Sequence, residues 1–140
     1  MLKSVGAVAA GFVTAAVLTF GTDAALSTLF PSVFGAEGDT PAAPVLCFIL
    51  AYTVAFGVLG SYLAAWFAPS HPMRHALALG AIALAIALLF TIVLWESAPA
   101  WYHVASDALI LPASYLGGLM RQRKSPPDSP THLNELENRR

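Results

Sequence analysis

Cysteine and charge are both scarce in this sequence. Only Cys47 occurs among 140 residues, which excludes an internal disulfide and any metal site with several cysteine ligands. Lys, Arg, Asp and Glu make up 11% of the chain, compared with about 25% in soluble domains. The formal net charge is -1, so the overall balance gives no indication of nucleic-acid binding. A chain with so little charge is not typical of a soluble domain.

Long apolar runs are present where charge is missing. Hydrophobic residues make up 57% of the sequence, and each of four runs reaches the ~20 apolar residues that a helix needs to cross a bilayer core. Helices are required because lipid offers no partner for an open N–H or C=O group. The alternating pattern of a membrane β-strand is missing from these runs. We predict helices at about 4–29, 44–68, 73–95 and 100–120.

The seven basic residues all lie on one side of these runs. Under the positive-inside rule, both termini and the turn between the second and third predicted helices therefore face the cytoplasm. The two other connections carry Glu37, Asp39 and Glu96 and no basic residue. The basic residues are Lys3 before the first helix, Arg74 between the second and third, and Arg121, Arg123, Lys124, Arg139 and Arg140 after the fourth.

The connections between the runs determine the expected topology. Residues 69–72 and 97–99 are short and contain proline, so the last three helices are sequential antiparallel neighbours. The longer connection after the first helix lets that helix pack back against the others. We predict an all-α, membrane-spanning, antiparallel four-helix bundle over residues 1–120. Residues 121–140 are rich in proline and charge and predict a disordered cytoplasmic tail.

The N-terminus also has features of a secretory signal peptide, with Lys3 before an apolar stretch. A signal peptide has an apolar region of about 7–15 residues. Here the apolar stretch continues beyond Asp23 to Phe30, which is longer than that. We therefore expect an uncleaved first membrane helix.

Small residues recur at four-residue spacing along the predicted helices. Such pairs let helix backbones approach closely in lipid, either within the chain or between copies. The leading functional interpretation is therefore a non-enzymatic membrane protein that packs with itself or with another membrane protein. The pairs are Ala7/Gly11, Gly57/Ser61, Gly60/Ala64, Ala76/Gly80, Ala81/Ala85, Ala113/Gly117 and Ser114/Gly118.

Two acids lie inside the predicted helices, where an ionisable side chain is costly and is by default a candidate for function. Asp23 and Asp107 lie near the outer ends of the first and fourth helices. Tyr52 of the second helix falls at a similar depth, and His103 lies one helical turn before Asp107. We take Asp23, Tyr52, His103 and Asp107 as a candidate polar or ion-binding layer.

Three interpretations of this layer are open. In the first, the acids bond to hydroxyls, Tyr52 or His103 and fix the first helix onto the fourth. In the second, they bind a proton or cation in a small transporter, which is the alternative function. In the third, His103 and Asp107 form a catalytic pair, but Ser106 points off their shared face. We expect no catalytic residues, no cofactor and no metal site, because two ligands without a further His or Cys are a weak metal signal.

Three basic residues directly follow the fourth predicted helix. Arg121, Arg123 and Lys124 lie beside the membrane surface, where each charge can attract anionic lipid by about 1 kcal/mol. The simpler interpretation of the same residues is a topology signal. The bilayer is therefore the one partner that the sequence predicts directly.

Several segments carry a resemblance that covers most of residues 1–120. They are the stretch YTVAFGVLGSYLAAWFAP at 52–69, PMRHALALG at 72–80, the opening MLKSV, GTD at 21–23 and WY at 101–102. With these segments, the chain resembles a group of small uncharacterised bacterial inner-membrane proteins. The resemblance implies a multi-pass, four-helix protein of the bacterial inner membrane, and it implies no activity.

Overall fold

The computed structural model describes residues 2–34 and 41–124, and it is helical throughout these ranges except at the turns. No β-strand occurs in the described ranges, so the all-α prediction is confirmed. The elements are α1 (Leu2–Leu29), the single-turn α2 (Pro31–Phe34), α3 (Ala43–Phe67), α4 (Pro72–Val93), the short 3₁₀ helix η1 (Trp95–Ser97) and α5 (Ala100–Lys124).

The four predicted helices correspond to α1, α3, α4 and α5, with one notable difference in extent. α5 continues to Lys124, although the sequence prediction places residues 121–124 in a disordered tail. Arg, Gln and Lys are good helix formers, and the first proline after Pro112 is Pro126, so the helix has no reason to stop at residue 120. The rest of the predicted tail, 125–140, lies outside the described residues, as do Glu37 and Asp39.

Three helices in the described part of the chain are long and apolar enough to cross a membrane: Lys3–Leu29, Ala43–Phe67 and Pro72–Val93. α5 has 25 residues, but polar side chains such as His103 and Asp107 interrupt it, and it is not among the three. Many large apolar side chains point outward, and Ile92 and Val93 are 75% and 78% exposed. Helices that are apolar on their outer faces are typical of a membrane-embedded protein.

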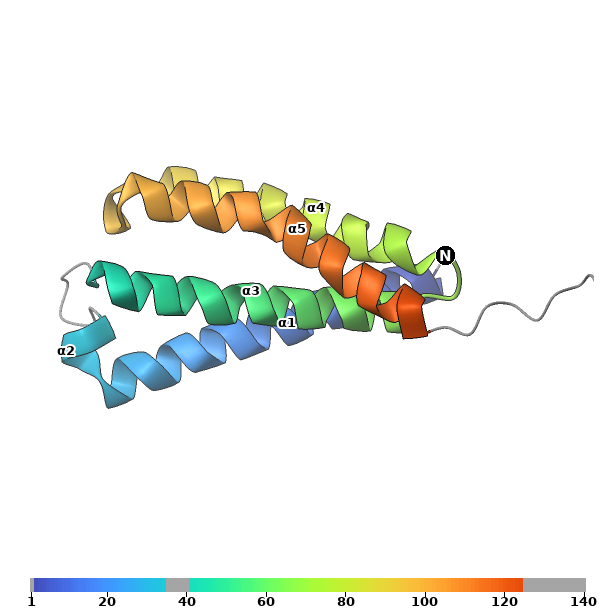
Figure 1. The fold of residues 1–140 in the computed structure, drawn as a ribbon, viewed down its shortest axis with the longest axis horizontal. Helices are drawn as coiled ribbons and strands as arrows, with labels where there is room; N and C mark the ends of the chain where they lie inside the picture. The colour runs from blue at the N-terminus through green and yellow to red at the C-terminus, as the bar shows by residue number, and fades with distance from the viewer. Residues whose placement is uncertain (1, 35–40, 125–140) are drawn as a thin grey trace, which may run out of the picture.

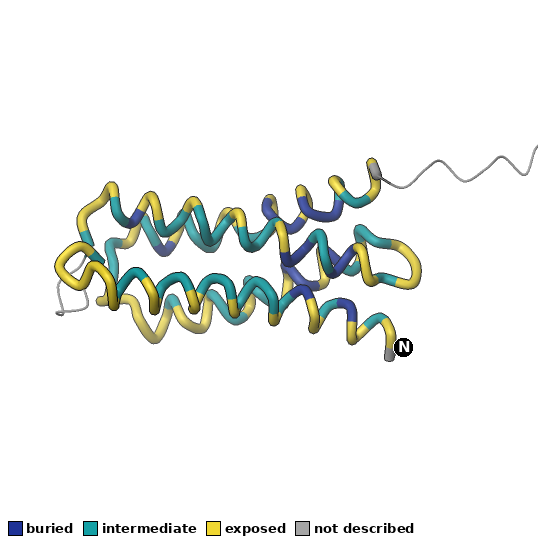
Figure 2. The backbone as a smooth tube through the Cα atoms, turned by 90° about the horizontal axis from the view of Figure 1, so that it is seen from below, coloured by how far each residue is buried: buried dark blue, intermediate teal, exposed yellow. Residues whose placement is uncertain are grey.

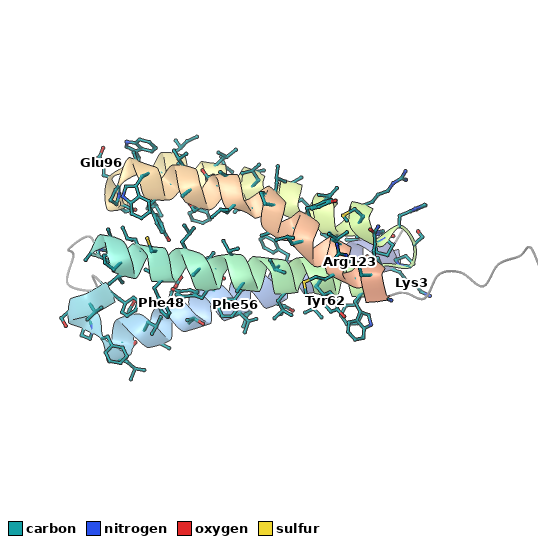
Figure 3. All side chains as sticks on the ribbon, viewed as in Figure 1. Lys3, Phe48, Phe56, Tyr62, Glu96 and Arg123 are labelled. Atoms are coloured by element: carbon teal, nitrogen blue, oxygen red, sulfur yellow. The ribbon has the colours of Figure 1, made fainter. Side chains whose placement is uncertain are left out.

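α3 packs as extensively against α5 as against α1, and α4 packs against α5. Figure 1 shows α1 beside α3 and α4 beside α5, and we call these the two helix pairs. Figure 1 shows the pairs meeting near the N-terminus and diverging toward the other end. We call the converging end, which carries Lys3, Arg74 and Arg123, the basic end. The diverging end carries Glu96 and is called the opposite end (Figure 3).

Buried residues concentrate toward the basic end (Figure 2). They are mostly small, because the helix backbones approach each other closely there. A Cβ atom added to Gly11 of α1 would lie 2.8 Å from the Ala64 Cβ of α3 and closer still to the carbonyl oxygen of Gly60. The most deeply buried apolar residues in this region are Ala7, Ala64, Ala65, Ala76 and Leu79.

α5 contains Pro112 in its interior and bends along its length (Figure 1). Proline removes one helical hydrogen bond and kinks a helix. Beyond the bend, α5 packs tightly: a Cβ added to Gly117 would lie 2.8 Å from the Ser61 Cβ of α3, and one added to Gly118 would lie 2.9 Å from the Ala76 Cβ of α4. Before the bend, α5 diverges from α3.

Candidate functional site

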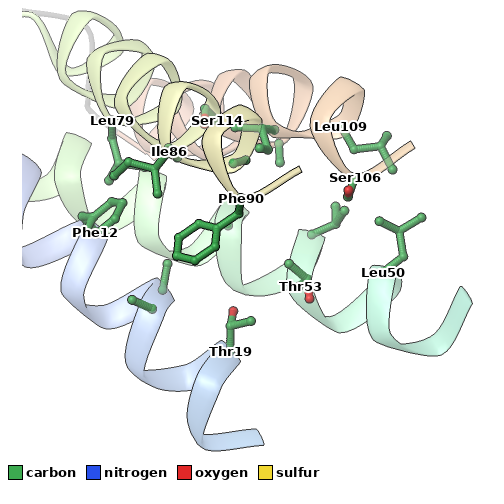
Figure 4. A pocket seen from close by; sticks show the side chains of 18 of the residues that line it. Phe12, Thr19, Leu50, Thr53, Leu79, Ile86, Phe90, Ser106, Leu109 and Ser114 are labelled. Carbon is green, nitrogen blue, oxygen red and sulfur yellow. The ribbon is translucent and has the colours of Figure 1, made fainter. Parts of the chain in front are cut away.

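A cavity of about 490 Å³ lies between the two helix pairs (Figure 4). Its size is within the ~300–1,000 Å³ typical of ligand sites. Its walls are almost entirely apolar, and Phe12, Leu79, Ile86 and Phe90 are among the lining side chains. The hydroxyl groups that line it belong to Thr19, Thr53, Ser106 and Ser114.

Asp23 lies beyond the cavity on α1 and is bonded to α3. The Tyr52 hydroxyl donates a hydrogen bond to Oδ1 of Asp23. The Tyr52 ring lies between Phe48 and Phe56, with ring centroids 5.5 and 5.8 Å away. Thr19, which lines the cavity, is one helical turn from Asp23, so this acid lies at the edge of the cavity toward the opposite end.

Asp107 lies at a comparable position on the other helix pair. The Thr91 hydroxyl of α4 donates a hydrogen bond to Oδ2 of Asp107 at 3.1 Å. The preceding residue, Ser106, lines the cavity. The two acids are therefore bonded within α1–α3 and within α4–α5. The structural interpretation had them joining the first predicted helix to the fourth, and the described hydrogen bonds do not make that link.

His103 is buried, with 7% of its surface exposed. Its ring stacks on Trp95 of η1, with centroids 5.5 Å apart and planes 17° apart. Among the described residues, its Nε2 has no hydrogen-bond partner. The Ser106 hydroxyl donates to the backbone carbonyl of His103 at 2.9 Å, so that hydrogen bond does not engage the imidazole. This geometry does not assemble a His–Ser relay.

The surroundings of the other candidate ligand-binding residues do not indicate a metal site. Within residues 2–34 and 41–124, no three His, Cys, Asp or Glu side chains lie close enough together to hold a metal ion. Cys47 is free and exposed. Arg121 lies over the Trp66 ring of α3, with its guanidinium carbon 5.9 Å from the ring centroid, and Arg123 is exposed.

The small-residue pairs mostly pack inside the chain. Gly11, Gly60, Gly80, Gly117 and Gly118 each face another helix so closely that a Cβ atom would meet it within 3.0 Å. The exception is Ala81/Ala85, where both residues are exposed. The sequence pattern alone does not distinguish packing within the chain from packing between copies, and the fold assigns most of these pairs to the interior.

Comparisons with family models, curated proteins and solved structures give no match to this chain. The candidate site therefore rests on its geometry. The cavity has no local sequence signal, because its walls are ordinary apolar residues on four helices that the fold brings together. Asp23, Asp107 and Tyr52, which the sequence predicts, are not among the lining residues. Asp23 lies one helical turn from the lining residue Thr19, and Asp107 follows the lining residue Ser106.

Proposed function

We propose that the protein spans the bacterial inner membrane with α1, α3, α4 and α5 and has both termini in the cytoplasm. The concentration of Lys and Arg at the basic end supports this orientation. α5 is as long as α3 and packs along α3 and α4, which supports a fourth span. In this orientation the cavity edge with Asp23 and Asp107 lies in the outer half of the membrane.

Within that arrangement, we propose a non-enzymatic protein that binds an apolar small molecule between its helix pairs. The observation that carries this proposal is the apolar cavity of about 490 Å³. Apolar pockets with a few polar groups are the usual form of small-molecule sites. The engagement of Ser106 with a backbone carbonyl supports binding rather than catalysis.

The charges near the cavity favour a ligand with a positive charge on an apolar body. Asp23 lies one helical turn beyond the lining residue Thr19, and Asp107 follows the lining residue Ser106. Glu96 lies at the same end of the bundle. The described Lys and Arg residues lie at the basic end. Opposite charge on the ligand would offset part of the cost of keeping a carboxylate at this depth. A lipophilic organic cation therefore fits both the walls and the edge.

Ala83→Leu tests the cavity directly, because Ala83 lines it. We expect the larger side chain to occupy the ligand's volume and to lower the affinity for tetraphenylphosphonium at least about tenfold, which corresponds to ~1.4 kcal/mol. Calorimetric titration of the protein in detergent micelles measures this affinity. Ala81→Leu is the matched control, since Ala81 is exposed on the same helix. Equal losses in both variants, or no binding by the wild type, would overturn the proposal.

Proton- or cation-linked transport is the second candidate, and the placement of Asp23 and Asp107 beside the cavity favours it. The titration is repeated with Asp23→Asn, Asp107→Asn and the neutral probe triphenylphosphine oxide. If the acids bind the cation, both variants lose affinity for tetraphenylphosphonium and keep it for the neutral probe. If both probes bind all variants alike, the site accepts apolar molecules without ion coupling.

Association with a second copy or another membrane protein is the remaining proposal. Ala81 and Ala85 support it, because both face outward at four-residue spacing, and small residues so placed let helices approach closely in lipid. The Ala81→Leu control protein addresses this as well. A smaller particle mass for this variant than for the wild type in the same micelles would favour association through α4.

A further inference from the structure

A second hollow, a groove of about 540 Å³, runs between α1 and α4 at the basic end. Its apolar walls are Val5, Val8 and Ala9 from α1 and Ala78 and Ile82 from α4. It shares only Phe12 with the cavity described above. The groove therefore does not form part of the proposed binding site at the cavity.

The groove is polar at one end and apolar along the rest of its length. Ser4, Arg74 and His75 line it, and all three lie in the first turns of α1 and α4 at the basic end. Arg74 is exposed, so its guanidinium is available to a ligand. From Arg74 to Ile82, α4 rises about 12 Å at ~1.5 Å per residue, and the groove residues of α4 beyond His75 are apolar. One cation at the mouth is thus followed by an apolar channel.

We propose that this groove holds one anionic phospholipid, with the phosphate at Arg74 and an acyl chain along Ala78 and Ile82. The shape and charge match because a phospholipid has the same order of groups, an anionic head followed by an apolar chain. Pro72 and Met73 precede Arg74 at the start of α4, which puts Arg74 at the depth of lipid headgroups if α4 spans the bilayer. The proposal does not depend on what the cavity binds.

Arg74→Gln tests the recognition of the headgroup. In native mass spectrometry of protein released from mixed micelles, we expect the wild type to retain phosphatidylglycerol in preference to phosphatidylcholine. A basic residue near the membrane surface contributes about fivefold in affinity, so Arg74→Gln should lower phosphatidylglycerol retention about fivefold. Arg123→Gln removes an exposed charge at the same end from α5, outside the groove. It is the control for general attraction of anionic lipid by surface charge, and it should lower retention less than Arg74→Gln does.

Ala78→Leu tests the channel, with Ala81→Leu as the control outside the groove. We expect Ala78→Leu to reduce the retention of phosphatidylglycerol while its thermal unfolding temperature matches that of Ala81→Leu. Equal effects of Arg74→Gln and Arg123→Gln would show that surface charge in general attracts the lipid, and would overturn the proposal. Equal retention of phosphatidylglycerol and phosphatidylcholine, or no effect of Ala78→Leu on retention, would also overturn it.

Discussion

At the residue scale, Asp23 and Asp107 each accept one hydrogen bond from a hydroxyl on a neighbouring helix. Tyr52 donates to Asp23, and Thr91 donates to Asp107. Such interhelical bonds contribute about 0.6 kcal/mol on average, whereas an aspartate at the centre of a membrane helix costs about 2.5–3.5 kcal/mol on insertion scales. If both helices span the bilayer, one hydroxyl offsets only part of the cost of a carboxylate, even nearer the outer end of a span. This supports the proposal that the charge of a ligand offsets the rest.

Tyr52→Phe measures how much the hydrogen bond to Asp23 stabilises the α1–α3 pair. The ring contacts with Phe48 and Phe56 are retained, so only the hydroxyl is lost. We expect a modest loss of stability, between about 0.6 and 1.7 kcal/mol, in thermal unfolding in lipid nanodiscs. Tyr115→Phe is the control, because Tyr115 is 49% exposed on α5 and should show no change. A loss larger for Tyr115→Phe than for Tyr52→Phe would contradict this account.

The position of His103 on its helix could be predicted from the sequence, but its surroundings could not. Helical spacing places it near Asp107 and at the depth of Asp23. Its main contact is the stack on Trp95, which depends on the η1 turn between α4 and α5. A three-residue 3₁₀ helix has no strong sequence signal, so this neighbour could not be predicted.

At the scale of the helix, two glycines of the same helix can have different surroundings, although helix length and composition do not distinguish them. Gly6 and Gly11 both lie in α1. A Cβ at Gly6 meets nothing within 4 Å, whereas a Cβ at Gly11 meets the Gly60 carbonyl oxygen and Ala64. The Gly60 oxygen is a backbone atom of α3 and cannot move aside without shifting the helix.

We therefore expect opposite effects from Gly11→Ala and Gly6→Ala. Alanine is favoured over glycine in a helix by up to about 1 kcal/mol, so Gly6→Ala should leave stability unchanged or raise it slightly. Gly11→Ala forces α1 away from α3, and overpacking of this kind costs about 1–3 kcal/mol. Thermal unfolding of both proteins in the same nanodiscs measures the difference. Equal stability of the two variants would show that α1 and α3 are not held this closely.

The helices were predictable, but the residues that face each other across the helix contacts were not. Apolar runs of sufficient length define α1, α3 and α4 within a few residues, because a membrane span requires a minimum length. Which small residues face each other depends on the rotation of each helix and on the bend of α5 near Pro112. That bend brings Gly117 onto α3 and lets the start of α5 diverge. The cavity depends on this divergence, and so it could not be predicted from local sequence.

At the scale of the whole molecule, burial and charge divide the bundle into two halves. The basic end is tightly packed with small residues (Figure 2) and carries the groove lined by Arg74. The opposite half holds the cavity and its neighbouring acids. If the basic end faces the cytoplasm, the cavity is nearest to the outer surface and the groove faces the inner leaflet. Orientation therefore decides which side supplies each proposed ligand.

Two serine positions test this orientation. Ser70 lies exposed between α3 and α4 at the basic end, and Ser97 is the exposed last residue of η1 at the opposite end. In a Cys47→Ser background, the only native thiol is removed, and Ser70→Cys or Ser97→Cys supplies one nearly isosteric reporter. We expect a membrane-impermeant maleimide to label Ser97→Cys in intact spheroplasts, and Ser70→Cys only after permeabilisation, because basic connections stay in the cytoplasm. The reverse pattern would place the cavity on the cytoplasmic side. Labelling of both before permeabilisation would refute the membrane topology altogether.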